Sequence, residues 1–204
     1  MLHYERACTE SGFDIVIGVD EAGRGPLAGP VVAAAVFSKD RVFQSRIDDS
    51  KKLTPRQREL AASEIIRESI CGIGIVNEKI IDRINILEAT KRAMEEAVAM
   101  LVEQLECSLL PRVHVLVDGT IPLALDFPYT VIVRGDSQSL SIACASIVAK
   151  VTRDTIMDFY DSVFPEYDFN RHKGYPTKAH RNALKKFGLS PIHRVTFSCK
   201  EMMS

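Results

Sequence analysis

Four acidic residues lie at the ends of apolar segments or shortly after them, where they could hold metal ions. Asp20 and Glu21 follow the run IVIGV, Asp118 follows VLV, and Asp136 lies between a predicted strand and a long predicted helix. Acidic side chains gathered without basic partners repel one another, which is costly unless a cation compensates. Oxygen ligands without a neighbouring His or Cys favour Mg2+ or Mn2+ over Zn2+. Two such ions, about 3.5–4 Å apart, can activate water for phosphodiester hydrolysis.

Each of these acids also has a simpler interpretation as a residue that ends a strand or forms a turn, because Asp is common in turns. Consecutive strand residues point to opposite faces, so Asp20 and Glu21 can share a site only if the strand bends there. Gly23 and Gly25 follow directly and would permit such a bend. The spacing alone does not establish that the four acids converge.

The glycine-rich segment Gly23–Gly29 (GRGPLAG) departs from the dinucleotide-binding pattern G-x-G-x-x-G, because its third glycine comes one position late. Pro26 interrupts it, no predicted helix follows, and two carboxylates adjoin the place where a phosphate would lie. We expect a backbone that approaches a ligand closely, with Arg24 available for a phosphate. The alternative is that the glycines only form a tight turn.

Positive charge is concentrated near the C-terminus, although 26 Lys and Arg against 27 Asp and Glu leave the chain at a formal charge of −1. Residues 170–200 contain eight Lys and Arg and no acid. Tyr175 lies among them in a Gly-Tyr-Pro turn, which suits stacking on a sugar or base beside neutralised phosphates. Lys51 and Lys52 form a second basic pair. A solvated surface is the alternative for the basic segment.

Apolar spacing and capping residues predict the elements that position these groups. Strands are predicted over 14–20, 30–37, 71–76, 113–118 and 129–133, with a turn over 21–26. Helices are predicted over 55–68 with a Thr54–Gln57 capping box, over 90–106, over 137–159, and from Thr177 to Phe187 with Gly188 after it. We therefore expect one mixed α/β sheet flanked by helices. Residues 1–204 would form a single domain with a basic helical segment from about 165.

No feature indicates secretion or a membrane. The longest apolar run, 31–37, is too short to span a bilayer, and the first residues do not resemble a signal peptide. The five cysteines are widely spread without a C-x-x-C, which disfavours a disulfide framework or a zinc knuckle. The histidines lack metal-ligand spacing, and His172, His180 and His193 are expected at the surface or in hydrogen bonds. We expect a cytoplasmic monomer without membrane contact.

Six blocks of the sequence, covering nearly the whole chain in the expected order, resemble bacterial ribonuclease HII. They are Gly18–Val36 (GVDEAGRGPLAGPVVAAAV), Asp49–Leu53 (DSKKL), Asp118–Gly119, Gly135–Asp154 (GDSQSLSIACASIVAKVTRD), His172–Thr177 (HKGYPT) and Pro191–Phe197 (PIHRVTF). The first block is highly specific, whereas D-G or Y-P-T alone would carry no weight. The related ribonuclease HIII family has an additional N-terminal domain and fits less well, since only thirteen residues precede the first predicted strand.

The resemblance implies a ribonuclease H-like fold and hydrolysis of the RNA strand of RNA–DNA hybrids. It also implies cleavage 5′ to single ribonucleotides in duplex DNA, leaving 3′-hydroxyl and 5′-phosphate ends. The implied catalytic ligands of Mn2+ or Mg2+ are Asp20, Glu21, Asp118 and Asp136. The implied substrate contacts are Gly23, Arg24 and Gly25 at the ribose 2′-hydroxyl, Tyr175 at the neighbouring deoxyribose, and Lys51, Lys52, Ser146 and Lys150 at phosphates.

Two other classes of protein fit parts of the sequence. A nucleotide-cofactor oxidoreductase would use the glycine-rich segment, and the departures from its pattern disfavour that class. A non-catalytic nucleic-acid-binding module would explain the basic segment but not four acids near strand ends.

Overall fold

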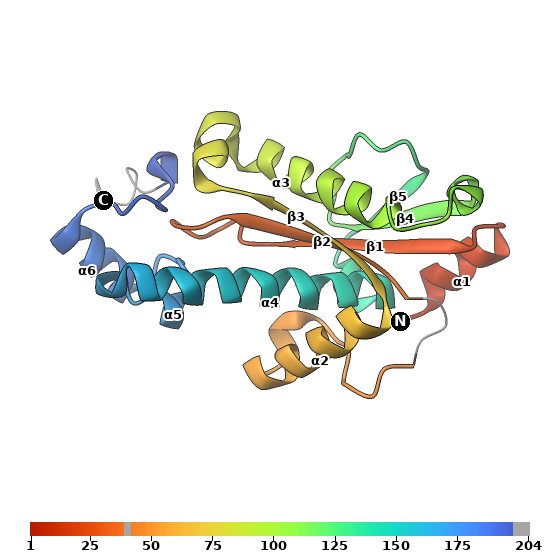
Figure 1. The fold of residues 1–204 in the computed structure, drawn as a ribbon, viewed down its shortest axis with the longest axis horizontal. Coiled ribbons are helices and arrows are strands. Elements are labelled where there is room, and N and C mark those ends of the chain that lie inside the picture. The colour runs from red at the N-terminus through yellow and green to blue at the C-terminus, as the bar shows by residue number, and fades with distance from the viewer. Residues whose placement is uncertain (39–41, 198–204) are drawn as a thin grey trace.

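Five strands form one mixed sheet in the computed structural model, which describes residues 1–38 and 42–197 (Figure 1). The strand order is β3-β2-β1-β4-β5, in which β1, β2 and β3 pair antiparallel, and β1 with β4 and β4 with β5 pair parallel. The strands are β1 Ile15–Ala22, β2 Val31–Phe37, β3 Ile70–Val76, β4 Val113–Asp118 and β5 Tyr129–Ile132. The expected mixed α/β sheet is confirmed.

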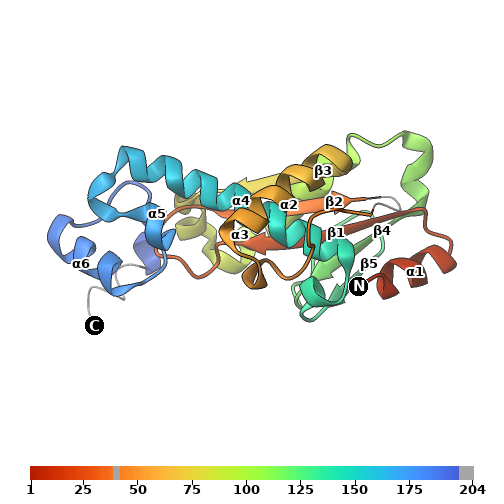
Figure 2. The ribbon, with the colours of Figure 1, turned by 90° about the horizontal axis from the view of Figure 1, so that it is seen from below.

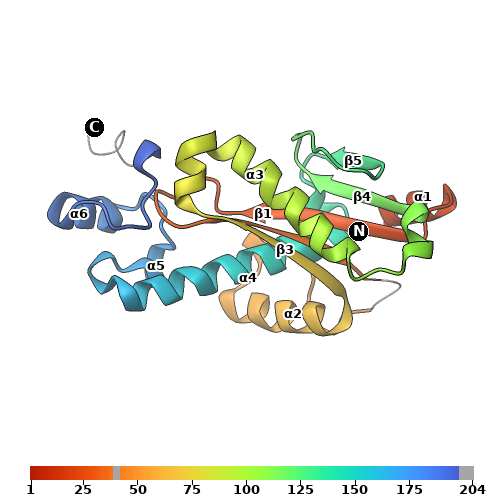
Figure 3. The ribbon, with the colours of Figure 1, turned by 45° about the horizontal axis from the view of Figure 1, so that its top comes forward.

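Helices cover both faces of this sheet. Figure 1 shows α3 above the sheet and α2 and α4 below it, and the same layering appears when the top is brought forward in Figure 3. The helices are α1 His3–Glu10, α2 Pro55–Glu68, α3 Glu78–Val102, α4 Leu140–Val163, α5 Phe169–His172 and α6 Lys178–Phe187. Short 3-10 turns are η1 Ser50–Lys52, η2 Cys107–Arg112, η3 Gly135–Ser137 and η4 Pro165–Tyr167. None of the helices in the described ranges is long and apolar enough to cross a membrane.

Strand alternation separates the two halves of the core. Ile17 and Val19 of β1 pack with α3, whereas the even-numbered positions of β1 face α4. Gly18 lies directly beneath the start of α4, and a Cβ there would come within 2.1 Å of the Ser141 carbonyl carbon. Only glycine permits this approach, which brings the first turn of α4 and the residues just before it close to β1.

Capping residues fix several element boundaries as predicted. Thr54 and Gln57 form the complete capping box of α2, and Thr177 caps α6, which ends before Gly188 at φ 78°. Ser139 caps α4, so this helix covers 140–163 and not the predicted 137–159. Strand β1 continues to Ala22, so the expected turn over 21–26 begins two residues too early.

Two helical segments were not predicted. Helix α3 begins at Glu78, twelve residues before the predicted start, and is kinked at Asn85, where φ is 69°. Helix α1 has no fully buried residue, and its apolar side is limited to the partly buried Tyr4 and Cys8, a signal too short to reveal it. It is held in part by Glu5, whose Oε1 accepts hydrogen bonds from the Ser139 hydroxyl at 2.6 Å and the Ser141 backbone N–H at 3.0 Å.

The expected C-terminal helical segment packs on the far end of α4. Figure 2 shows α5 and α6 gathered at one end of the molecule, opposite α1. Their small core includes Tyr167 and Phe169, whose rings stack with centroids 5.3 Å apart. Backbone hydrogen bonds join this segment to the glycine-rich segment, from Leu27 N to Gly174 O and from Gly29 N to Ile192 O, both at 2.8 Å.

Candidate active site

The four predicted acids lie at one edge of the sheet. Strands β1 and β4 are adjacent and parallel, so Asp20 near the end of β1 and Asp118 at the end of β4 share that edge. Glu21 follows Asp20 within β1, and Asp136 lies in η3, immediately before α4. Asp20 and Asp136 are buried, at 6% and 7% exposure.

Burial and mutual repulsion oppose ionisation of the two acids on β1. Burial raises the pKa of Asp20 well above its usual value, and the carboxylates of Glu21 and Asp118 raise it further. Burial also raises the pKa of Glu21. The positive charge of Arg24, whose Nη1 lies 3.3 Å from Glu21 Oε1, acts to lower that pKa. The Ser146 hydroxyl and the Glu21 backbone N–H, at 2.7 Å, donate hydrogen bonds to Asp20 and favour its charged form.

The other two acids belong to the same electrostatic cluster. Asp118 Oδ1 accepts a hydrogen bond from Gly135 N at 2.6 Å, which ties the end of β4 to η3. Burial raises the pKa of Asp136, and the carboxylates of Asp49 and Asp118 raise it further. Asp118 thus acts electrostatically on each of the other three predicted acids. The four acids thus lie in one region of the structure, where Asp118 links them electrostatically.

One cationic side chain reaches into this cluster. Lys51 Nζ lies 3.8 Å from Asp136 Oδ2. Although burial acts to lower it, the pKa of Lys51 is raised by surrounding carboxylates, those of Asp49, Asp136, Asp20 and Asp118. A mobile surface ammonium group therefore lies beside the acids and offsets part of their negative charge.

The donor set suits a hard divalent cation, because it consists of carboxylate oxygens in a setting where negative charge is costly. Within residues 1–38 and 42–197, however, no three His, Cys, Asp or Glu side chains are placed closely enough to hold one ion together. The four acids would therefore hold Mg2+ or Mn2+ only with their side chains closer together than in this arrangement.

The glycine-rich segment and Tyr175 are neighbours, as a shared substrate site requires. Gly23 has φ 100°, and a Cβ there would lie 2.1 Å from Arg153 Nε, so both its backbone and its surroundings demand glycine. A Cβ on Gly25 would lie 3.7 Å from Cε1 of Tyr175. Arg24, Gly25 and Tyr175 are all exposed. The loop after β1 and the Gly-Tyr-Pro turn together form one accessible surface.

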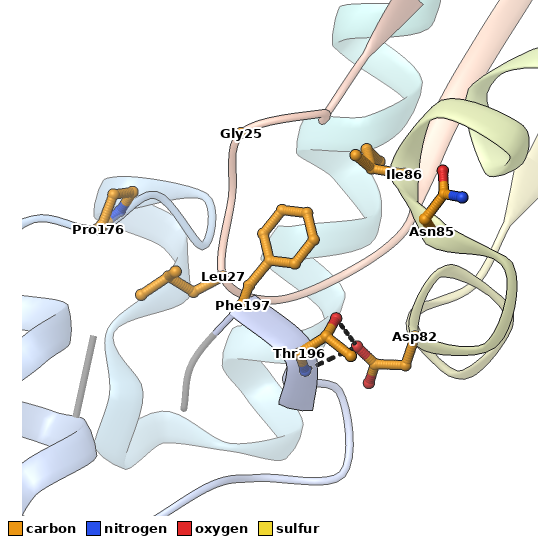
Figure 4. Close-up of a pocket in the computed structure, with 8 residues that line it drawn as sticks. All are labelled: Gly25, Leu27, Asp82, Asn85, Ile86, Pro176, Thr196 and Phe197. Atoms are coloured by element: carbon orange, nitrogen blue, oxygen red, sulfur yellow. Dashed lines mark hydrogen bonds between the residues drawn. The ribbon is translucent and has the colours of Figure 1, made fainter. Parts of the chain in front are cut away.

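A pocket of about 460 Å³ opens beside this surface (Figure 4). Figure 4 shows the Phe197 ring projecting between the glycine-rich segment and Ile86 of α3. The walls of the pocket are mainly apolar. The residues that line it are Gly25, Leu27, Asp82, Asn85, Ile86, Pro176, Thr196 and Phe197. Sequence analysis did not anticipate this pocket, because its walls come from four separate segments of the chain.

The remaining predicted phosphate contacts have partners within the protein. Lys52 Nζ lies 3.0 Å from Asp48 Oδ1, and Lys150 Nζ lies 2.6 Å from Asp154 Oδ1. The buried Ser146 hydroxyl lies 3.0 Å from the Ser50 hydroxyl, in addition to its contact with Asp20. Of the three predicted lysines, Lys51 is the one whose ammonium group forms an ion pair with a predicted metal ligand.

Three residues near the site were missed. Asp49 interacts electrostatically with both Asp136 and Lys51. The two acids followed closely by two lysines in DDSKK could have drawn attention to it. Arg153 and Arg194 are almost fully buried at 1% and 0% exposure and donate hydrogen bonds to the glycine-rich segment. Arg194 is one of the eight cations of the basic segment, for which contact with nucleic acid and a solvated surface were the two interpretations. Neither applies to this buried side chain, and a buried arginine carries no distinguishing sequence pattern.

The three C-terminal histidines are buried and not at the surface, and they support the Tyr175 turn. His180 Nδ1 donates a hydrogen bond to the Tyr175 carbonyl at 3.0 Å. His180 Nε2 must then accept from His193 Nε2, 2.9 Å away, while His193 Nδ1 accepts from Ser190 N at 2.9 Å. The rings of His172 and His180 stack with centroids 4.4 Å apart. Their hydrogen-bonding role is as expected.

A mixed sheet flanked by helices, with acids near the ends of adjacent parallel strands, is the arrangement expected of a ribonuclease H-like fold. Comparisons with known proteins agree. A family profile described as Ribonuclease HII matches residues 17–200. The Ribonuclease HII of Ruminiclostridium cellulolyticum is 50% identical over 198 residues, which is 97% of this chain and 75% of that protein.

Solved structures extend the likeness. The ribonuclease H2 of Pyrococcus horikoshii OT3 superposes with a TM-score of 0.69 at 26% identity, covering 93% of this chain and 98% of that one. Bst-RNase HIII, solved in complex with Mn2+, superposes with a TM-score of 0.70 at 16% identity. The superposition covers 97% of this chain and 71% of that one. Because Bst-RNase HIII is only 16% identical to this chain, the comparison with it shows a shared fold and nothing more.

The chain belongs to the ribonuclease HII family. It is therefore a metal-dependent endoribonuclease that cleaves the RNA strand of RNA–DNA hybrids. The resemblance stated from the sequence and the ribonuclease H-like fold are confirmed, and the oxidoreductase and non-catalytic alternatives fall away.

Proposed function

We propose that this enzyme also cuts duplex DNA on the 5′ side of a single embedded ribonucleotide and leaves 3′-hydroxyl and 5′-phosphate ends. The observation that carries the proposal is the position of the glycine-rich segment. It continues directly from the acids of β1 and contacts Tyr175 through Gly25. A ribose recognised by this surface would thus lie next to the proposed catalytic carboxylates, without help from further ribonucleotides.

The proposed ligands of the catalytic ions are Asp20, Glu21, Asp118 and Asp136. Two divalent cations, Mn2+ or Mg2+, would supply an activated water for in-line attack and stabilise the departing 3′ oxygen. The acids contribute a concentration of negative charge that only Lys51 and Arg24 offset by direct ion pairs within the described residues. Asp20 is further oriented by Ser146 and by the Glu21 N–H, which limits the directions in which its oxygens can point.

Selectivity for RNA depends on the 2′-hydroxyl, the group that distinguishes the two nucleic acids locally. We assign its recognition to the backbone of Gly23, Arg24 and Gly25, which approaches a ligand closely because two of the three residues lack a side chain. Tyr175 would pack on the deoxyribose that follows. Its ring is 41% exposed and is backed by Arg153, whose Cζ lies 5.9 Å from the ring centroid.

Lysines would supply the phosphate contacts. Lys51 is the first candidate, because its exposed ammonium group lies beside Asp136 and could neutralise a phosphate bound at the acids. Lys52 and Lys150 would exchange Asp48 and Asp154 for phosphate oxygens. Ser146 serves the site through Asp20 in the present arrangement.

The test uses a DNA duplex with one embedded ribonucleotide, incubated with Mg2+, Mn2+ or EDTA. We expect a single cut 5′ to the ribonucleotide with either ion and none with EDTA. Ligation of the upstream fragment and phosphatase sensitivity of the downstream fragment identify the ends. Intact duplex under all conditions, alongside cleavage of a long RNA–DNA hybrid, would overturn the proposal while leaving the family activity in place.

A further inference from the structure

Two arginines are buried without a carboxylate partner. Arg153 on α4 and Arg194 after α6 are 1% and 0% exposed, and neither takes part in an ion pair among the residues that the structure describes. Burial lowers the pKa of Arg153 to about 10 and that of Arg194 to about 9, so both stay charged at neutral pH. A buried charge is costly unless it is hydrogen-bonded. These two must therefore serve a purpose other than neutralising a carboxylate.

Both guanidinium groups donate to backbone carbonyls of the segment 23–30. Arg194 donates to Gly23 O at 2.6 Å, to Arg24 O at 3.0 Å, and to Gly29 O at 2.8 Å and 3.0 Å. Arg153 donates to Ala28 O at 3.1 Å and Pro30 O at 3.0 Å, and also to Lys173 O at 3.0 Å, two residues before Tyr175. The two arginines thus hold the segment from inside the molecule.

The orientation of the peptide groups follows from these bonds. In a planar trans peptide the C=O and N–H bonds point in opposite directions. Because Arg194 draws the carbonyls of Gly23 and Arg24 inward, the N–H groups of Arg24 and Gly25 must point away from the buried guanidinium. Neither N–H has a hydrogen-bond acceptor within residues 1–38 and 42–197, and both residues are exposed. Two free donors therefore face outward beside Tyr175.

We propose that Arg194 is a positioning residue for ribose recognition, which turns the N–H groups of Arg24 and Gly25 outward as donors to the substrate. The inference rests on the proposed function, because it assigns those N–H groups to the 2′-hydroxyl side of the substrate. Arg194 touches no substrate atom itself. It acts through the two carbonyls that it holds.

Asp82 on α3 holds Arg194 in turn. Its carboxylate accepts hydrogen bonds from Thr196 N at 3.0 Å and from the Thr196 hydroxyl at 2.5 Å (Figure 4). It also accepts one from Val195 N at 2.8 Å. These bonds fix the backbone immediately after Arg194, so the guanidinium enters the core from a defined point. Asp82 is a second, more distant positioning residue in the same chain of contacts.

Lysine cannot reproduce this arrangement. Arg194 uses Nε and both terminal nitrogens in one plane to reach three carbonyls, whereas a lysine ammonium is a single point on a flexible stem. The variant R194K keeps the charge and loses the planar fork. It therefore separates the orientation of the loop from the presence of a buried cation.

The experiment measures the Kd of two duplexes in Mg2+, one with a single ribonucleotide and one of identical sequence in DNA alone. The background is D136N, chosen so that no cleavage occurs. We expect R194K to reduce the preference for the ribonucleotide by about tenfold, the loss of one to two hydrogen bonds, with the affinity for plain DNA nearly unchanged. The matched control is R92K, which makes the same exchange at an exposed arginine of α3 paired with Glu96.

A folded R194K variant that keeps the full preference would overturn the inference, as would equal weakening for both duplexes. If R194K does not fold, D82N decides, since it retains Arg194 and loosens only its attachment; a reduced preference supports the inference and an unchanged one overturns it. If the D136N parent, which retains Arg194, binds both duplexes equally, the proposed function is refuted instead.

Discussion

Lys51 Nζ lies 3.8 Å from Asp136 Oδ2, so the acidic cluster contains a cation supplied by the protein itself. The Lys51 side chain is 83% exposed and the Asp136 side chain 9%, which means that the lysine can withdraw while the acid stays. Surface ion pairs of this kind contribute little to stability. The cluster therefore has a charge partner that is easily displaced by a divalent ion.

Asp136→Asn tests the metal-binding role most directly. The amide has nearly the shape of the carboxylate but carries no charge, so we expect cleavage to fall by at least about 100-fold, as when a group that stabilises developing charge is removed. Without metal, the melting temperature should stay the same or rise, because the change relieves repulsion from Asp49 and Asp118. Asp126→Asn, at an exposed loop position, is the control. A marked drop in melting temperature would assign Asp136 a structural role instead.

Metal binding should be visible without substrate. We expect Mn2+ or Mg2+ at 100 times its Kd to stabilise the protein by about 2.7 kcal/mol, which raises the melting temperature by about 5–10 °C. Lys51→Gln should reach half of this shift at a lower ion concentration, because the competing ammonium is gone. Thermal melts over a metal titration measure both effects. Equal titrations for the wild type and the lysine variant would show that Lys51 does not compete with the ion.

Helix α6 should contact nucleic acid through Lys185 and Lys186, which are exposed on it. Replacing both by Gln should reduce the slope of log K against log salt by up to about 2, since each phosphate contact contributes about 0.9. The control is the double change K91Q/R92Q on α3, where both cations are paired with acids of the same helix. An unaltered slope in K185Q/K186Q would show that these lysines face solvent and do not contact phosphates.

Stability should fall in mild acid because of two histidines. Burial lowers the pKa of His180 and of His193 to about 4, whereas an exposed imidazole titrates near about 6.5. The unfolded chain therefore takes up protons first, so this contribution is complete above pH about 6.5 and is lost as the pH falls toward 4. The slope would reach up to about 1.4 kcal/mol per pH unit for each ring.

Imidazole resonances followed by NMR across this pH range test the assignment, with free imidazole added to the sample as the reference. His180 and His193 should remain neutral while the free imidazole becomes protonated. Protonation of either buried ring together with the free imidazole would contradict the hydrogen-bond chain from Ser190 to the Tyr175 carbonyl.

Glu5→Gln should destabilise the fold without affecting catalysis. Glu5 Oε1 accepts three hydrogen bonds at the start of α4, two from hydroxyl groups at 2.6 Å and one from Ser141 N at 3.0 Å. Negative charge is favourable at a helix N-terminus, and hydrogen bonds to charged groups contribute more than neutral ones. We expect unfolding to become easier by about 1.5–3 kcal/mol in denaturant titrations. Glu10→Gln, exposed at the end of α1, should change little.

The parts of the fold that could be predicted were those with a local signal. The capping box of Thr54 and Gln57 marks the start of α2, and apolar runs mark all five strands. Helix α1 has too weak a signal, because only Tyr4 and Cys8 pack on the core and much of its attachment to α4 is through the Glu5 carboxylate. The first part of α3 was missed because Asn85 breaks the helical path there and shifts the apolar spacing.

In the candidate site too, the residues with a local sequence signal could be predicted and the others could not. Acids that follow apolar runs can be recognised from sequence, and the structure brings Asp20 and Asp118 to one edge because β1 and β4 are parallel neighbours. Arg194 could not be recognised, since a lysine or arginine in a basic segment looks the same whether it faces phosphates or backbone carbonyls. Its burial depends on contacts with residues more than 160 positions earlier, which no local pattern encodes.

The joining of residues 23–30 to the segment around 192–194 has a consequence for how the enzyme is made. A growing chain emerges N-terminus first, so the carboxylates of β1 leave the ribosome long before Arg194 does. Until residue 194 is free to fold back, the loop behind those carboxylates lacks its inner support. The inner support that Arg194 gives to this loop is therefore completed only late in translation, after β1 and β4 have been made.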